Sequence, residues 1–224
     1  MASGPLLKTA AAATLLLAGC GEPAPASRPP NILVFLADTL RADRLGCYGG
    51  PEQTSPRIDA FARQGIRFAH ATAPSPYTSP SHASLFTSMD PAAHGVWNRV
   101  LLPSGAPIFP RLAEGSTTLA EALATAGYQT AAIADGGNVS EARGFAQGFQ
   151  YFESKFCGAR SRVDRALDWL EKRDPERGFF IWVHLFEPHQ PYAPPARHRK
   201  GALKQDPYLG EIATLDEHIG TLLD

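Results

Sequence analysis

The feature that constrains this sequence most is a pair of almost continuously apolar runs, ILVFLA at residues 32–37 and FFIWVHL at residues 179–185. Runs of this length without polar alternation are typical of parallel strands that are buried on both faces. Segments with helical periodicity lie between these runs and after them. The alternation predicts an α/β fold in which helices flank a layered, mostly parallel central sheet.

Capping residues and turn residues set the boundaries of the other predicted elements. Ser55 precedes Pro56 at a helix start, and Thr118 and Glu121 fit a capping box. The sequence predicts helices from Pro56 to Gly65, from Thr118 to Gly127, from Ser161 to just before Pro175 and from Pro207 onward, with strands at 66–69 and 128–134. The last helix has a long apolar face. Either the sheet covers that face, or the chain is a fragment of a longer enzyme.

The first thirty residues have the composition of an export signal and a tether. Lys8 precedes a short apolar stretch, and Leu17-Ala18-Gly19-Cys20 has the small-residue pattern of a bacterial lipoprotein cleavage site. We therefore expect a signal peptide at 1–19, a lipidated Cys20 within a Pro/Ala-rich tether at 20–30, and a single α/β domain from residue 31 onward. The alternatives are a plain secretory signal or a short membrane helix. The lipoprotein interpretation implies a protein anchored to the bacterial cell envelope and facing the periplasm or the exterior.

Composition excludes some partners. The 21 basic and 22 acidic residues nearly cancel, so no basic excess points to nucleic acid. Besides Cys20 there are two cysteines, Cys47 and Cys157, which either pair or remain separate thiols.

An acid and a hydroxyl stand where an α/β enzyme holds its ligands. Asp38 follows the first apolar run, at the expected carboxyl end of a strand. In the segment TSPSHASLFTS, which begins at Thr78, Ser79 suits an N-cap and Pro80 the first helical position. The amides of such a helix start attract sulfate or phosphate, and a cation held by Asp38 would activate the Thr78 hydroxyl. The simpler alternative is a well-capped helix without catalytic meaning.

At these residues the sequence resembles the sulfatase family, part of the alkaline phosphatase superfamily. The matching strings, in the family's order, are NILVFLADTLRADRLGCYG, TSPSHASLFTSMDPAAHGV, TTLAEALATAGYQTAAI, GFAQGF and HLFEPHQPYAPP. The resemblance extends from Asn31 to Asp224 and implies that residues 31–224 are the N-terminal part of a sulfatase-like catalytic domain. It implies an alkaline-phosphatase-like fold and an enzyme that cleaves sulfate or phosphate esters.

The resemblance also implies roles for individual residues. Asp38 would be a metal ligand, Thr78 the nucleophile in contact with the metal, and His189 a group near the anionic part or leaving oxygen of the substrate. His184 is a weaker candidate for substrate binding. His94 and Asn98 could orient the segment after the nucleophile helix, and Asn98 could also bind substrate, although a structural role suits both. For each histidine the alternative is an ordinary core or surface residue.

Three departures from the family pattern bear on the chemistry. Sulfatases have cysteine or serine at the position of Thr78, because that side chain is oxidised to formylglycine, and threonine cannot form this aldehyde. Threonine is what the phosphate-handling branches of the superfamily use. The arginine that the family has two residues after the proline is replaced by His82, which could bind an oxyanion with a charge that depends on pH. A second acid after Asp38 is replaced by Thr39.

The metal implied by the resemblance is zinc or calcium. Family members supply further ligands from an Asp-His or Asp-Asn motif on a later strand, and residues 1–224 contain no such motif at the expected place. We therefore expect an incomplete site, so that residues 1–224 by themselves bind metal weakly and turn over little or no substrate. Three functions stay open: a metal-dependent hydrolase of sulfate or phosphate esters, a transferase that passes a phosphoryl-linked group through Thr78, and a catalytically silent lipoprotein with the same fold.

Overall fold

The computed structural model describes residues 29–51 and 54–224. The signal peptide, Cys20 and most of the tether lie outside the described residues. Its strands are β1 Ile32–Ala37, β2 Val100–Leu101, β3 Pro107–Ile108, β4 Gln129–Ala134, β5 Tyr151–Ser154 and β6 Phe179–Leu185. Its α-helices are α1 Pro56–Ala62, α2 Thr78–Thr87, α3 Pro91–His94, α4 Leu119–Thr125, α5 Gly158–Lys172, α6 Ala202–Gln205 and α7 Pro207–Leu223.

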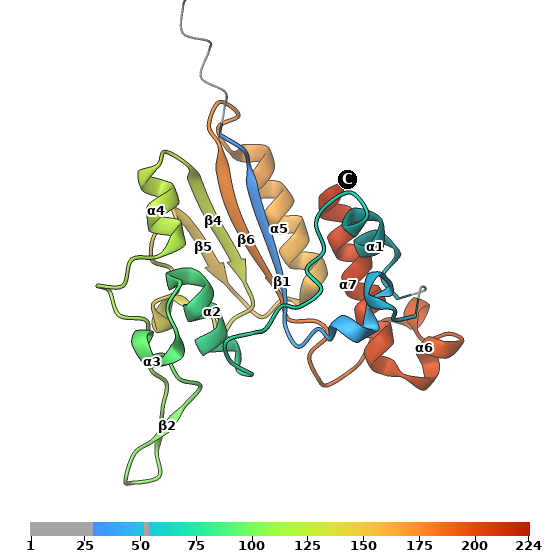
Figure 1. Cartoon of the computed structure of the whole chain (residues 1–224), viewed down its shortest axis with the longest axis horizontal. Helices are drawn as coiled ribbons and strands as arrows, with labels where there is room; N and C mark the ends of the chain where they lie inside the picture. Colours follow the sequence, from blue (N-terminus) through green and yellow to red (C-terminus); the bar gives the residue numbers. More distant parts are fainter. Residues whose placement is uncertain (1–28, 52–53) are drawn as a thin grey trace, which may run out of the picture.

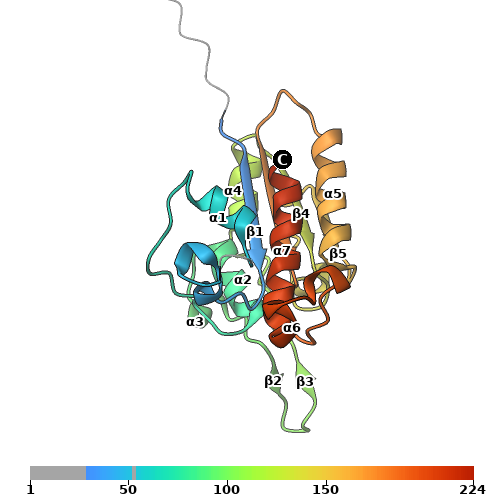
Figure 2. The ribbon, with the colours of Figure 1, turned by 90° about the vertical axis from the view of Figure 1, so that its right-hand side faces the viewer.

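A four-stranded parallel sheet in the order β1-β6-β4-β5 forms the centre of the molecule (Figure 1). Helices α2 and α4 lie on one side of it, and α5 and α7 on the other (Figures 1 and 2). The predicted fold class is confirmed. Within the described residues β1 pairs only with β6, so β1 is an edge strand, and all six of its side chains are half-buried.

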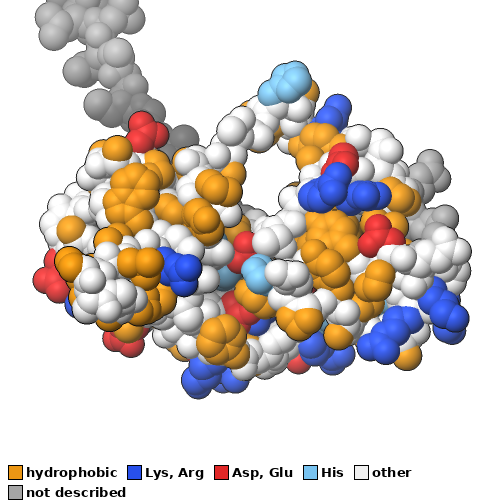
Figure 3. Space-filling model, turned by 90° about the horizontal axis from the view of Figure 1, so that it is seen from below, with side chains coloured by type: hydrophobic (Ala, Val, Ile, Leu, Met, Phe, Trp, Pro, Cys, Tyr) orange, Lys and Arg blue, Asp and Glu red, His pale blue; other side chains and the backbone are white. Residues whose placement is uncertain are grey.

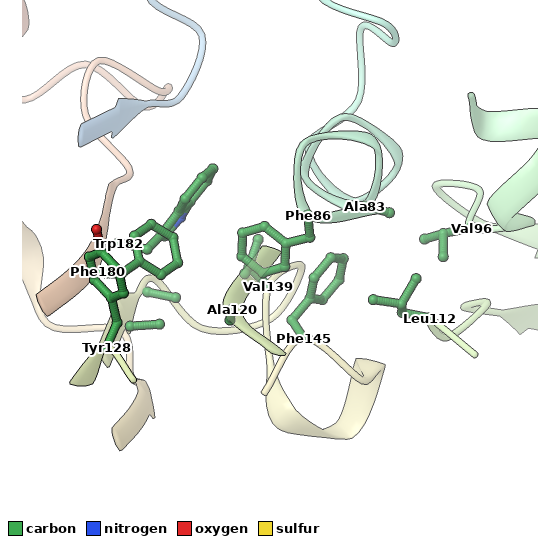
Figure 4. Packing of buried hydrophobic residues seen from close by; sticks show 12 residues of the cluster. Ala83, Phe86, Val96, Leu112, Ala120, Tyr128, Val139, Phe145, Phe180 and Trp182 are labelled. Carbon is green, nitrogen blue, oxygen red and sulfur yellow. The ribbon is translucent and has the colours of Figure 1, made fainter. Parts of the chain in front are cut away.

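The side chains of successive residues in each strand point to opposite faces of the sheet. Because helices cover both faces, both sets of side chains are apolar, which explains the unbroken apolar runs. On β6, Phe180 and Trp182 pack under α2 and α4, whereas Ile181 and Val183 pack under α5 and α7. Figure 4 shows the first of these clusters, in which Phe86 of α2 lies beside Trp182 and Phe145. A parallel strand covered by helices on both sides has no face left for polar residues.

The apolar face of α7 is covered by the sheet and its neighbouring helices. Leu215, Ile219 and Leu222 pack against the α5 side of the sheet, and Asp206 caps the helix by accepting a hydrogen bond from the Tyr208 amide. The capping box of Thr118 and Glu121 is also present as predicted. No helix in the described part of the chain is long and apolar enough to span a bilayer.

The structure corrects four local predictions. Residues 66–69 form no strand and are exposed (Figure 2). Helix α5 begins at Gly158 rather than at Ser161, and β5 was not predicted. Helix α2 begins two residues earlier than expected, because Tyr77 rather than Ser79 stands at the N-cap. Cys47 and Cys157 are both free thiols.

Candidate active site

Four of the side chains predicted to form the site line one cavity of about 200 Å3, at the carboxyl ends of the parallel strands. They are Asp38, Thr78, His184 and His189. Figure 3 looks onto this side of the molecule, where acidic and histidine side chains lie next to one another among hydrophobic ones. The carboxyl edge of an open parallel sheet is where α/β proteins bind ligands.

Asp38 and Thr78 are in direct contact. The Asp38 amide donates a hydrogen bond to the Leu185 carbonyl oxygen at 2.9 Å. This bond continues the β1–β6 ladder by one residue and holds the backbone of Asp38 in place. Thr78 is the first residue of α2. Its Oγ1 donates a hydrogen bond to Asp38 Oδ2 at 3.0 Å, so the strand end and the helix start are joined through these two side chains.

Asp38 is ionised at neutral pH. Burial by itself would raise the pKa of this carboxyl group, but the neighbouring His184 ring and the hydrogen bond from Thr78 outweigh it and lower the pKa below its ordinary value. A carboxylate of low pKa is a weak proton acceptor. Asp38 therefore suits the binding of a cation, or the orientation of the hydroxyl, better than the role of a general base.

His184 lies behind Asp38. Its side chain is only 2% exposed, and its Nε2 is 3.6 Å from Asp38 Oδ2. Both of its ring nitrogens are buried and have no hydrogen-bond partner among the described residues. His184 therefore borders the cavity between Asp38 and the ring of His82, whose centroid is 4.6 Å from its own.

His82 stands beneath Thr78 as a buried neutral ring. Its Nδ1–H donates to the Thr78 carbonyl oxygen at 2.9 Å, and its Nε2 is buried without a partner in the described structure. Burial, followed by the charge of His184, lowers the pKa of His82 to about 3. At neutral pH this side chain brings no positive charge to the position where the family has arginine.

His189 is half-buried at the rim of the cavity. Its ring stacks on Phe186 with a centroid distance of 4.3 Å and an interplanar angle of 20°. Nδ1–H donates to the Gln190 carbonyl oxygen at 2.7 Å. The remaining ring nitrogen, Nε2, is the one that can serve a ligand.

Asn98 and His94 are not part of this cavity. Asn98 borders a separate depression together with Tyr77 and Trp97. His94 accepts from the Val96 amide at Nδ1 and donates from Nε2 to Ser84 Oγ, at 3.0 Å in each case. These internal hydrogen bonds give His94 the structural role that the sequence favoured.

Sequence reasoning missed the turn after β4. Gly136, Gly137 and Asn138 line the cavity opposite Asp38, as does Phe156. Ser79 Oγ donates to the Asn138 carbonyl oxygen at 2.9 Å, which ties this turn to the first turn of α2. The signal was the Gly-Gly-Asn string directly behind a predicted strand, the position at which parallel sheets place their binding loops.

The donors in the cavity fit a divalent cation in part. Asp38 offers a carboxylate and Thr78 a hydroxyl in contact with it, and oxygen donors of this kind suit a hard cation. No group of three or more His, Cys, Asp or Glu side chains within residues 29–51 and 54–224 has a geometry that could hold a metal ion. Asp38 and Thr78 therefore fit as members of a ligand set that needs further donors.

Comparison with known proteins places this chain in a family. A family model described as sulfatase matches residues 30–224. The chain belongs to the sulfatase family.

Sulfatase relatives match the chain over part of their own length. The N-acetylglucosamine-6-O-sulfatase of Bacteroides thetaiotaomicron is 28% identical over 221 residues, which cover 88% of this chain and 38% of that protein. Human arylsulfatase A is 42% identical over 104 residues, or 46% of this chain and 20% of that protein. The solved structure of the yidJ protein from Bacteroides fragilis has a TM-score of 0.71 at 19% identity and covers 91% of this chain and 60% of that one, so it confirms the fold. The chain thus spans well under half the length of the two curated sulfatases.

Proposed function

We propose that this sulfatase-family chain supplies the nucleophile and one metal ligand of a hydrolase that cleaves sulfate or phosphate esters. The observation that carries the proposal is the 3.0 Å hydrogen bond from Thr78 Oγ1 to Asp38 Oδ2 at the start of α2. The amides in the first turn of this ten-residue helix favour an anionic group beside the hydroxyl. A nucleophile, a carboxylate and a site for an anion are thus within one cavity.

In the proposed reaction, Thr78 Oγ1 attacks the phosphorus or sulfur atom of the ester. The new bond to Oγ1 forms as the bond to the alcohol oxygen breaks; the hydroxyl proton of Thr78 passes to solvent, and the alcohol leaves with a proton from His189. Water then attacks the phosphorus or sulfur atom and the bond to Oγ1 breaks. One proton of the water restores the hydroxyl, the other returns to His189, and inorganic phosphate or sulfate is released. Asp38 orients the hydroxyl, and we assign to His189 the donation of a proton to the leaving oxygen. A divalent cation held by Asp38 and Thr78, zinc or calcium, would lower the pKa of the hydroxyl.

Two considerations bear on the class of substrate. Thr78 cannot become formylglycine, so a covalent threonine ester is the available intermediate, and this chemistry favours phosphate esters. The relatives that match the chain include an N-acetylglucosamine-6-O-sulfatase, whose name indicates a sulfated sugar. We therefore assign to the cavity an anionic ester of a carbohydrate or small alcohol, with phosphate favoured over sulfate.

The test compares aryl phosphate, aryl phosphodiester and aryl sulfate with zinc or calcium added, using the parent chain, Thr78→Ala and Thr78→Ser. The incomplete ligand set keeps turnover in the parent low, and we expect this low turnover to fall by about 10³-fold or more in Thr78→Ala, because the nucleophile is lost. Thr78→Ser keeps a hydroxyl and is the matched control. Mass spectrometry of the quenched parent should find phosphate on Thr78. Equal rates in the parent and Thr78→Ala, with unmodified Thr78, would contradict the proposal.

We also propose that Cys20 anchors the protein in the bacterial cell envelope. The support is the Leu17-Ala18-Gly19-Cys20 pattern, which lies outside the described residues. Metabolic labelling with an alkyne fatty acid should label the parent in the membrane fraction. Cys20→Ala should be unlabelled, with Cys47→Ala as a labelled control. A labelled Cys20→Ala protein would argue against lipidation at this position.

A further inference from the structure

Three charged side chains form a cluster behind the candidate site, in which Arg162 and Asp135 are buried and Glu187 is half-buried. Arg162, in the first half of α5, is 1% exposed. Its Nη2 is 2.7 Å from Asp135 Oδ2, and its Nη1 is 3.2 Å from Glu187 Oε2. One guanidinium group therefore bridges two carboxylates from different parts of the chain.

Both carboxylates stand at the start of a loop that lines the cavity. Asp135 follows the last residue of β4 and precedes the turn at 136–138. Glu187 follows β6 by two residues and precedes the loop that carries His189. The second carboxylate oxygen of Glu187 accepts a hydrogen bond from the Ala159 amide at 3.0 Å, at the start of α5. The cluster thus joins one helix start to two strand ends.

The link continues to the nucleophile. Within the turn at 136–138, the Asn138 carbonyl oxygen accepts from Ser79 Oγ at 2.9 Å. Its side-chain oxygen accepts from Arg143 Nη1 at 3.1 Å. Ser79 is the neighbour of Thr78 in the first turn of α2. A shift of the turn after β4 would therefore reach the helix start that holds the hydroxyl.

The cluster is poorly built for stability. Two carboxylates face a single cation, and Arg162 Nε and Asp135 Oδ1 are buried without a partner among the described residues. Burial raises the pKa of Asp135 against the opposing effect of Arg162. Neutral side chains of similar volume in place of such buried ion clusters are often as stable or more so. A contribution to geometry accounts for the cluster better than a contribution to stability.

We infer that Arg162 is a positioning residue, which fixes the loops after β4 and β6 and thereby sets where His189 and the 136–138 turn stand relative to Thr78. The functional meaning of this inference rests on the proposed function, because the two loops border the cavity assigned to the ester. Arg162 itself lies behind the loops and is not a lining residue of the cavity.

The test uses two variants that alter the cluster in different ways. The first, Asp135→Asn/Arg162→Met/Glu187→Gln, removes every charge and leaves no buried carboxylate unpaired. The second, Arg162→Lys, keeps the charge but lacks the planar fork that reaches both carboxylates. The matched control is Arg165→Met on the same helix, since Arg165 pairs with Glu153 of β5, away from the cavity.

The first readout is the position of the His189 ring protons by NMR, assigned with His189→Gln. In the parent, the stacked Phe186 ring shifts these signals. The second readout is the affinity for inorganic phosphate, followed by isothermal titration. The NMR signals of His189 are measured on the free protein and need no turnover, so they test the role of Arg162 even if the chain hydrolyses no ester.

We expect both cluster variants to lose the ring-current shift of His189 and to bind phosphate about tenfold more weakly or worse, the usual size of effect for residues that orient a site from behind. Arg165→Met should match the parent in both readouts. If either cluster variant folds and keeps the parent His189 signals and phosphate affinity, the inference is wrong. Because Arg162→Lys retains the buried charge, it provides this comparison even if the neutral triple variant does not fold.

Discussion

At the scale of single residues, buried histidines make the stability of this protein depend on pH. Burial is the main cause of a lowered pKa in His82, His94 and His218. An unfolded chain restores each of these groups to a pKa near about 6.5. Below that pH the unfolded state binds more protons than the folded state, so stability falls as the pH drops from about 6.5 toward the folded pKa, which is about 3 for His82.

We predict that the free energy of unfolding decreases from pH 7 to pH 5 and that His82→Asn reduces this slope. One such histidine contributes at most about 1.4 kcal/mol per pH unit. Urea titrations at several pH values measure the slope separately from any packing defect, which acts at every pH. His70→Asn is the control, because His70 is exposed. An unchanged slope in His82→Asn would show that its burial does not couple to protonation.

The sequence predicted the chemical residues of the site better than their surroundings. Asp38 and Thr78 could be found because each stands at a position that α/β folds use, a strand end and a helix start. Arg162 could not be found this way, because its position along α5 does not distinguish it from the other charged residues of that helix. Its burial between Asp135 and Glu187 depends on contacts between residues 25 or more positions apart.

At the scale of elements, the capping box of α4 joins the helix to the loop before β5. Thr118 Oγ1 accepts from the Glu121 amide at 3.1 Å and donates to the Gln147 carbonyl oxygen at 3.1 Å. We predict that Thr118→Ala lowers the free energy of unfolding by about 1–2 kcal/mol. Thr125→Ala at the other end of α4 should leave it nearly unchanged, since that hydroxyl is exposed. Chemical denaturation of both variants compares them, and equal losses would contradict the capping role.

Gly148 is required where the same loop passes the start of α4. Its φ is +82°, and a Cβ there would lie 2.2 Å from the Glu121 amide nitrogen. Gly105 has a similar φ of +81° with nothing within 4 Å. We predict that Gly105→Ala costs about 1–2 kcal/mol for its backbone alone. Gly148→Ala should cost at least about 2 kcal/mol more through the steric clash. Urea unfolding of the pair measures this difference, and equal costs would rule the clash out.

The elements that the sequence predicted well have strong local patterns, and those it missed depend on neighbours. β1 and β6 are unbroken apolar runs, and α7 has apolar residues at helical spacing. β5 has the sequence YFES, which carries no clear period, and it becomes a strand because the edge of β4 is available to it. Residues 66–69 have apolar residues at strand spacing, but no strand lies beside them in the described structure.

At the scale of the whole molecule, two of the hydrophobic clusters share the sheet, one on each of its faces. Trp182 belongs to the cluster under α2 and α4, and Trp169 packs against the one under α5 and α7. Because β4 and β6 contribute alternate residues to both clusters, neither cluster can unfold while the other stays intact. We predict that both tryptophans report the same unfolding midpoint.

The measurement uses urea titrations followed by fluorescence in two variants. Trp97→Phe/Trp169→Phe leaves Trp182 as the reporter, and Trp97→Phe/Trp182→Phe leaves Trp169. Midpoints are compared after correction for the stability of each variant by circular dichroism. Two separate transitions would show that the faces of the sheet unfold independently.

The position of β1 at the edge of the sheet bears on the behaviour of the chain in concentrated solution. Its six residues, ILVFLA, include no charge and no proline, the features with which natural edge strands block unwanted pairing. Among residues 29–51 and 54–224 no strand pairs with the outer edge of β1, which is bordered by half-buried apolar side chains. Strand addition at this edge is a route to aggregation that the near-zero net charge of the chain does little to oppose. Sedimentation should therefore shift toward larger species as the protein concentration rises.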